Sequence, residues 1–475
     1  MRLALHIFRK DVRRLWWGIA AALLLQTAAC FDISFANGLT WSALLMVAWA
    51  TLLALAVHED PLVGDRQFWI TRPARWRVLL ASKLLFALAV IHVPSFLADV
   101  AVLAAHGFRP WEFLGTLLTK QLALAAGLTV PTIALAAVLR SFAHMALAVI
   151  AIAGLSYAGA SLEFSWSVTW PWTGAETVRF VLMGAIVGAG GLSVVWWQFA
   201  RRRTWPSRLV GVTSVLAAEL VLVFVSPVFL TRVRAAVNPT PAGITFRVRT
   251  SQYGETGVPV GMRYYAPPGI VPMTVPLDVS GIPQGLRSLY GPSLLDITAP
   301  GGEHMEARAG YFGRDAMVVW LPRRFYDRLK NAKVQLKGAV TMVLYRAGSS
   351  TSLPVGVKRA VPGMGRCSTG FFTVPGFGPE HANVQLRCES PTGSPLPGFV
   401  KFWEGDANRT AELDWRPIPG LAPLKLAEAS FPLSPGDDPR PSGRFEITPD
   451  IPAGWRVVDL DLRDLRLRDY VLAAD

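Results

Sequence analysis

The run LVGVTSVLAAELVLVFVSPVFL, residues 209–230, separates two parts of the chain that differ in composition. Charged side chains number 28 up to residue 230 and 52 after it, although the two parts are similar in length. About 20 apolar residues are enough to cross a bilayer. The contrast predicts a polytopic helical membrane region followed by a water-soluble region, because the two parts obey different solvation rules.

Six further apolar runs bring the predicted number of membrane spans to seven. Basic clusters precede the first span and follow the second and sixth, and Arg140 follows the fourth, whereas the alternate connections carry only Arg109 and Arg179. Cytoplasmic connections are rich in Lys and Arg, so we expect a multi-pass protein of the bacterial inner membrane, with a cytoplasmic N-terminus and an extracytoplasmic C-terminal part. The six runs are Leu15–Phe31, Trp41–Val57, Val78–Ala101, Leu117–Leu139, Phe142–Ala160 and Phe180–Ala200.

The first 14 residues have the pattern of a helix that lies in a membrane surface. Leu5, Phe8 and Val12 recur at helical spacing, while Arg9 and Lys10 occupy the other side. This predicts an amphipathic interfacial helix over residues 1–14 that leads into the transmembrane domain at 15–230. The alternative is a basic tail that only sets the topology.

The stretch HEDPLVGDRQFWITRPARWRVLLASKLL, residues 58–85, joins the second and third predicted spans. Asp60 before Pro61 is a helix start signal, because a carboxylate caps the first turn and proline fits the first helical position. Pro73 disfavours helical geometry in the residue before it and can open the helix that enters the third span. Residues 58–83 are therefore predicted to display a short charged helix on the cytoplasmic face, where a partner can bind it.

This layout resembles the membrane subunits of ATP-binding cassette exporters of the second type. The quoted stretch carries the resemblance, with Glu59 closing the second span, then Gly64, a turn at Pro73, and Lys83 opening the third span. The resemblance covers roughly the first 200 residues. A seventh span and a large appended outer domain depart from the pattern of that family.

The resemblance implies that this segment contacts a separate cytoplasmic ATPase subunit. The chain has no GxxxxGK[ST] phosphate loop, so ATP and Mg are expected on that partner, with no cofactor and no enzyme activity on this chain. Permease chains of this kind are expected to form homo- or heterodimers. The residues implied to contact the ATPase are Glu59, Asp60, Gly64, Asp65, Arg66, Pro73 and Lys83.

Four ionisable residues fall within the predicted spans. Counting 1.5 Å per residue places His92 and Glu219 near mid-bilayer, where a carboxyl usually faces a partner or a wet cavity. One hypothesis is a His92–Glu219 contact, and the slightly favoured alternative is a protonated Glu219 bonded within the bundle beside a neutral His92. Asp99 and Lys120 come out near the outer surface, where reaching water is favoured over a buried pair.

After Leu230 the sequence changes to short apolar or alternating runs broken by Pro and Gly. Turn signals every 8 to 15 residues predict an all-β, sandwich-like extracytoplasmic domain, with subdomains at 231–350 and 351–475. A short helix is expected at Pro322–Lys330. Cys367 and Cys388 lie 21 residues apart, and their spacing leaves a disulfide and two unpaired thiols about equally possible.

The sequence contains no catalytic or metal-binding motif among HExxH, GxSxG, CxxC and calcium-loop patterns. The net charge of +14 does not favour nucleic acid, because the basic residues of the first part cluster at the ends of apolar runs. Two functions follow. One is a transporter permease for a hydrophobic or amphipathic substrate, and the other is a membrane-anchored scaffold or binding protein whose outer domain recognises a ligand or partner.

Overall fold

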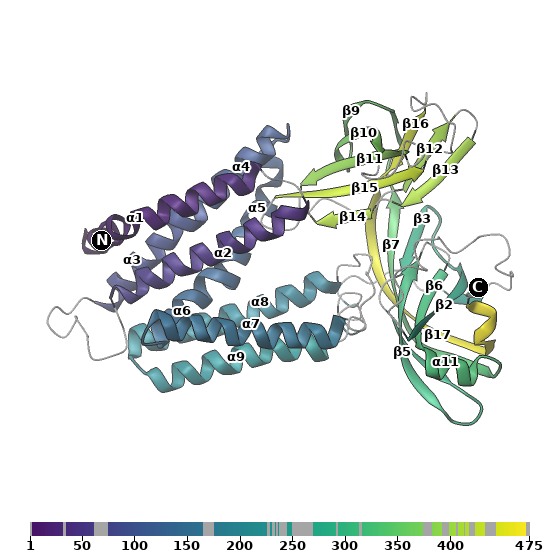
Figure 1. Cartoon of the computed structure of the whole chain (residues 1–475), viewed down its shortest axis with the longest axis horizontal. Helices are drawn as coiled ribbons and strands as arrows, with labels where there is room; N and C mark the ends of the chain where they lie inside the picture. Colours follow the sequence, from purple (N-terminus) through teal and green to yellow (C-terminus); the bar gives the residue numbers. More distant parts are fainter. Residues whose placement is uncertain are drawn as a thin grey trace. The chain divides into compact units, whose positions relative to one another are not determined.

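The fold follows the predicted change from helices to strands (Figure 1). In the part that the structure describes, the regular elements are mainly helical up to Phe224, and from Thr245 they are almost all strands. The protein is seen in a computed structural model that describes residues 2–31, 35–60, 75–164, 175–225, 229, 233, 236, 245–248, 269–290, 293–312, 316–373, 382–391, 399–404, 407–412, 414–417, 423–432 and 443–471.

Two long helical segments change their winding part-way along. Trp76–Ala105 consists of α3 (Trp76–Ala87), a π-helical turn η2 (Leu88–His92) and α4 (Val93–Ala105). Pro110–Val138 consists of η3 (Pro110–Phe113), α5 (Leu114–Leu124), a second π-helical turn η4 (Ala125–Thr129) and α6 (Val130–Val138). The other long elements are α1 (Arg2–Phe31), α2 (Phe35–His58), α7 (Phe142–Phe164), α8 (Ala175–Trp196), η5 (Trp197–Arg201) and α9 (Thr204–Phe224).

Among the described residues, four helices are long and apolar enough to cross a membrane. They are Trp41–His58, Trp76–Ala105, Pro110–Val138 and Val181–Arg201. The chain is thus of the membrane-protein type, while the count of seven spans stays a prediction. α1 runs without a break from Arg2 to Phe31, so the predicted interfacial helix and first span are one helix.

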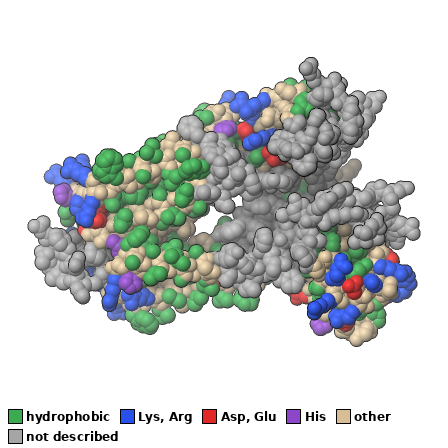
Figure 2. All heavy atoms as spheres, in the orientation of Figure 1, with side chains coloured by type: hydrophobic (Ala, Val, Ile, Leu, Met, Phe, Trp, Pro, Cys, Tyr) green, Lys and Arg blue, Asp and Glu red, His purple; other side chains and the backbone are tan. Residues whose placement is uncertain are grey.

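The surface of the helical region also suits a lipid environment. Figure 2 shows hydrophobic side chains spread over the helices on the face in view, with Lys and Arg gathered at one end. Trp17, for example, is 72% exposed, and Leu24, Leu122 and Phe224 are similarly open. Contiguous exposed apolar surface of this kind is unfavourable in water and ordinary against lipid tails.

The first β region is one antiparallel sheet in the order β1-β2-β6-β5-β4-β7-β17, and β3 also pairs with β7. Side chains such as Met273, Leu336 and Val340 form its core. The helix α11 (Arg323–Leu329) lies between β6 and β7, as predicted, and a short η8 (Leu467–Tyr470) follows the last strand. The strands are β1 (Thr245–Val248), β2 (Ile270–Ser280), β3 (Leu286–Tyr290), β4 (Ser293–Thr298), β5 (His304–Phe312), β6 (Ala316–Pro322), β7 (Lys333–Ala347) and β17 (Asp450–Arg466).

The second β region is a sandwich of a five-stranded sheet, β14-β15-β11-β10-β9, and a four-stranded sheet, β13-β12-β16-β8. Phe431 of the first sheet packs against Phe402 and Phe445 of the second, with ring centroids 5.6 and 5.8 Å apart. The strands are β8 (Thr351–Pro354), β9 (Lys358–Val361), β10 (Gly365–Thr373), β11 (Ala382–Pro391), β12 (Phe399–Glu404), β13 (Ala407–Glu412), β14 (Asp414–Pro417), β15 (Leu424–Pro432) and β16 (Arg444–Thr448).

The predicted boundary between the β subdomains needs one correction. Residues 450–466 were expected in the second subdomain, 351–475, but β17 pairs along its length with β7 of the first sheet. Alternating Leu and charged residues in β17 place Leu460 and Leu462 in the first core, and Leu465 joins them after a shift of register that follows Leu462. Residues 223–348 and 450–475 accordingly belong to one compact unit, and the sandwich residues 349–449 belong to the other unit with most of the helices.

Candidate functional site

A buried cluster of charges joins three helical elements at the two ends of the predicted coupling segment. The Lys83 ammonium in α3 lies 2.8 Å from Asp11 Oδ2 in α1 and 2.7 Å from Asp60 Oδ2, just beyond α2. Lys83 is 1% exposed and Asp11 is fully buried. One cation thus bridges two carboxylates that belong to different helical elements.

Two further ion pairs extend this cluster toward its exposed side. Lys10 Nζ donates to Asp60 Oδ1 at 3.0 Å, and Arg14 Nη1 lies 2.6 Å from Glu59 Oε2. Both cations belong to α1, one helical turn apart, and both carboxylates follow one another after α2. The N-terminal helix therefore carries the cations that hold the start of the coupling segment.

The pKa shifts of the cluster follow from this geometry. Burial by itself would raise the pKa of the Asp60 carboxyl, but the charge and hydrogen bond of Lys83, with those of Lys10, outweigh burial and lower that pKa. For Lys10, burial favours the neutral form, yet the hydrogen bond and charge of Asp60 prevail and raise the pKa of the ammonium. The ionised forms of both groups are thereby stabilised.

The structure brings together three of the seven predicted coupling residues. Glu59, Asp60 and Lys83 meet in the cluster, whereas Gly64, Asp65, Arg66 and Pro73 lie outside the described residues. Lys83 is buried and its ammonium is paired with Asp11 and Asp60 of the same chain, while its contact with an ATPase subunit stays a prediction.

Sequence reasoning missed Asp11, the innermost carboxylate of the cluster. A signal was present, because Asp11 is the only acidic residue among the first 31 positions and stands between Lys10 and Arg13. An acid inside a basic amphipathic helix is easily taken for a solvated side chain. Only the packing of α1 against α3 reveals that it faces Lys83.

A second polar group lies inside the helical bundle, between the two segments with π-helical turns. A carbonyl oxygen only accepts, so His92 Nδ1 donates to Gln121 Oε1 at 2.9 Å. In a neutral ring, His92 Nε2 then accepts from the Thr129 hydroxyl at 3.0 Å. Both ring nitrogens are thereby used, and the hypothetical His92–Glu219 contact is not formed.

The local sequence explains why these polar side chains sit at changes of helical winding. The π-helical turns η2 and η4 each end one residue before a Val-Pro pair, His92-Val93-Pro94 in one helix and Thr129-Val130-Pro131 in the other. Proline lacks the N–H that an α-helix needs and crowds the preceding turn, and a wider turn relieves both problems. The last residues of the two turns, His92 and Thr129, are the ones that bond to each other.

The third polar group is a buried ion pair of Asp99 in α4 with Lys120 in α5. Lys120 Nζ lies 2.6 and 2.7 Å from the two carboxylate oxygens, and Asp99 is 4% exposed. The favoured expectation that both side chains simply reach water was wrong. The rise per residue gave them similar depths but said nothing about whether the helices place them side by side.

Cys367 and Cys388 form a disulfide, which decides the alternative that spacing left open. They are directly opposite each other in β10 and β11, and both are fully buried in the sandwich core. Disulfides persist in oxidising compartments, so the bond agrees with an extracytoplasmic sandwich.

The described residues contain no group of three or more His, Cys, Asp or Glu side chains that could hold a metal ion. Comparisons of the chain with protein-family models, with curated protein sequences and with solved structures gave no match.

Proposed function

We propose that this chain is the permease subunit of an ATP-driven transporter, powered by a separate cytoplasmic ATPase subunit that binds residues 58–83. The buried cluster of Lys83, Asp11 and Asp60 is the observation that carries the proposal. It ties together the two places where the predicted coupling segment leaves and re-enters the helices. A partner that moves this segment thus acts on α1 and α3 together.

The charge cluster gives this movement a route into the membrane region. Lys83 belongs to the same long helical segment, Trp76–Ala105, that carries His92 and Asp99. These two residues bond to the neighbouring segment Pro110–Val138 through Thr129, Gln121 and Lys120. A displacement that begins at the cluster would therefore reach a second membrane-capable helix through polar contacts, which are directional and resist sliding.

The character of the helices favours a hydrophobic or amphipathic substrate. Asp99 and Lys120 pair with each other, and the exposed surface of the helices is largely apolar. A substrate that moves along these helices meets mainly apolar side chains. A second permease chain, identical or related, would supply the other wall of the pathway.

Affinity purification of the full chain from native membranes tests the proposal. We expect an ATPase subunit to co-purify with the wild type and to be lost from Asp65→Ala/Arg66→Ala, which changes the segment and leaves Lys83, Asp11 and Asp60 unsubstituted. The exposed Lys337→Gln, on β7, serves as the control and should retain the subunit. Membrane preparations in which the wild-type chain is abundant and carries no ATPase would refute the coupling proposal.

A membrane-anchored binding protein is the second candidate, favoured by the size of the β regions and by the disulfide-bonded sandwich. In that case the main partner would bind the β regions. The same purification then yields a partner that survives Asp65→Ala/Arg66→Ala and has no ATPase activity.

A further inference from the structure

The sandwich contacts the helical hairpin formed by α4, η3 and α5. Leu424 and Leu426 of β15 share a buried apolar cluster with Val102, Leu103 and Leu117 of the hairpin. Beside this cluster, Arg366 Nη1 of β10 donates to the His106 carbonyl oxygen at 3.0 Å. Together these contacts hold strands β9 and β10 next to the hairpin loop.

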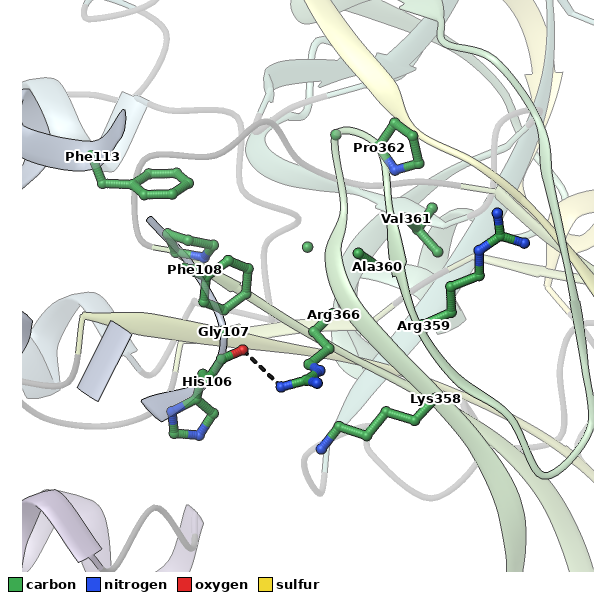
Figure 3. Close-up of a pocket in the computed structure, with 13 residues that line it drawn as sticks. His106, Gly107, Phe108, Phe113, Lys358, Arg359, Ala360, Val361, Pro362 and Arg366 are labelled. Atoms are coloured by element: carbon green, nitrogen blue, oxygen red, sulfur yellow. Dashed lines mark hydrogen bonds between the residues drawn. The ribbon is translucent and has the colours of Figure 1, made fainter. Parts of the chain in front are cut away.

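A pocket of about 550 Å³ opens between the loop and these strands (Figure 3). This volume is in the range of small-ligand sites. The loop contributes His106, Gly107 and Phe108, and η3 contributes Phe113. Strands β9 and β10 with the turn between them contribute residues 358–363, 365 and 366, and Pro391 completes the lining.

The pocket is basic. Lys358, Arg359 and Arg366 line it, and no Asp or Glu does. Within the part of the chain that the structure describes, none of these three cations has a carboxylate within ion-pair distance. The nearest acid by strand register is Glu389, opposite Arg366, which does not line the pocket.

Two of the three cations share one face of the sheet. Ala360 is directly opposite Arg366 and Lys358 is opposite Ser368, so Lys358 and Arg366 point to the same side, whereas Arg359 points to the other. Figure 3 agrees, with Lys358 and Arg366 directed toward the loop and the Arg359 guanidinium turned away from it.

The position of the loop places this pocket at the boundary of the membrane. One membrane-capable helix ends at Ala105 and the next begins at Pro110, so the loop between them lies where the apolar layer ends. Trp111 is 70% exposed beside it, as expected of an aromatic side chain at a lipid–water interface. This placement holds whichever side of the membrane the loop occupies.

We propose that this pocket binds the phosphate of an anionic membrane amphiphile. Lys358 and Arg366 would donate to the phosphate oxygens, for which a guanidinium and an ammonium are suited. Phe108 and Phe113, whose rings pack edge to face, form an apolar wall for the part of the molecule that joins the headgroup to its chains. This site requires only that the helices lie in a membrane, so it is independent of coupling to an ATPase.

Gly107 is the residue that lets the loop approach Arg366. Its φ is +78°, a conformation that favours glycine, and an added Cβ would lie 3.2 Å from Arg366 Nη1. A side chain at this position would push the guanidinium away from the His106 carbonyl. Gly107→Ala therefore disturbs the same cation without removing its charge.

The experiment uses the purified full chain in a neutral detergent and photoactivatable analogues of phosphatidylglycerol and phosphatidylcholine. We expect preferential labelling by the anionic analogue, with cross-links in residues 106–113 or 358–366. Arg366→Gln and Lys358→Gln should each weaken binding about tenfold, because each loses a charge-assisted hydrogen bond. Lys401→Gln removes one exposed charge on the other sheet and should bind as the wild type does.

Arg366→Lys separates loss of binding from loss of folding, because it keeps the charge and should retain more binding than Arg366→Gln. Equal labelling by the two lipids, or undiminished binding in both Gln variants, would overturn the proposal. An excess of inorganic phosphate distinguishes a membrane amphiphile from a free anion. If phosphate fails to displace the lipid analogue, the result supports an amphiphile. Full displacement, together with tight binding of phosphate alone, would overturn the proposal in favour of a free anion.

Discussion

Lys83 and Asp11 are 72 positions apart in the sequence, yet their charged atoms lie 2.8 Å apart in a place that water barely reaches. Burial of either charge alone is costly, and the cost is offset only while both are present with good geometry. The ion pair is therefore favourable only while α1 is packed on α3.

Removal of Lys83 alone should destabilise the protein far more than removal of Lys83 and Asp11 together. We expect Lys83→Met to lower the unfolding free energy by about 3–5 kcal/mol, because it leaves the buried Asp11 carboxylate without its nearest cation. Asp11→Asn should cost less, because Lys83 keeps its ion pair with Asp60. The double variant should be more stable than the sum of the two changes predicts. Thermal unfolding of the full chain in detergent, followed by size-exclusion chromatography, measures the difference. Strictly additive losses would show that the two residues do not interact.

Acid should weaken the charge cluster through Asp60. The folded-state pKa of this carboxyl is lower than its ordinary value of 3.8, so its contribution is complete above that value. It is lost as the pH falls through the lowered folded pKa, when Asp60 becomes protonated. Stability measured from neutral pH down to about pH 3 should therefore fall more steeply in the wild type than in Asp60→Asn. Identical slopes would mean that folding does not lower the pKa of Asp60.

A charge exchange should distinguish a true Asp99–Lys120 pair from two independent side chains. Asp99→Lys and Lys120→Asp each place like charges together in a buried site, so each alone should greatly reduce the yield of monodisperse protein. The combined exchange restores opposite charges and should recover part of this yield. Fluorescence-detected size exclusion of tagged full chains provides the readout. Failure of the exchange to improve on either single variant argues against the pair.

Reduction of the Cys367–Cys388 disulfide should destabilise the sandwich. The bond closes a loop over a sequence separation of 21 residues, for which chain-entropy models give about 3 kcal/mol. Cys367→Ser/Cys388→Ser should thus show a lower melting temperature than the wild type. Reductant should lower the melting temperature of the wild type and leave that of the double variant unchanged. Cys30→Ser, which removes the cysteine outside the bond, is the control and should not change the response to reductant.

The sequence predicts the depth of a residue in the membrane and the type of element that contains it better than it predicts which distant residues are in contact. Apolar run length identified helices such as Trp76–Ala105, and alternation identified strands, because both depend on local solvation and on period. Asp99 and Lys120 came out at similar depth by counting residues. Their contact was not predictable, because the lateral arrangement of helices depends on packing between distant segments.

The same limit applies to Asp11 and to the final strand. Asp11 looks like one charge among the cations of an amphipathic helix until α3 is placed beside it. β17 has the alternation of a strand, and its residues were expected in the second subdomain, 351–475. Its actual partner is β7, more than a hundred residues earlier, and local pattern contains no information on such pairing.

The return of β17 to β7 has a consequence for biogenesis. Ala347 at the end of β7 and Asp450 at the start of β17 are direct register partners, so residues 348–449 form an insertion within a single hairpin. During synthesis the inserted sandwich is complete before the last strand of the surrounding sheet emerges. Until β17 has been synthesised, the first sheet therefore has an open edge at β7. A chain truncated before Asp450 would leave that edge exposed to pairing with other molecules.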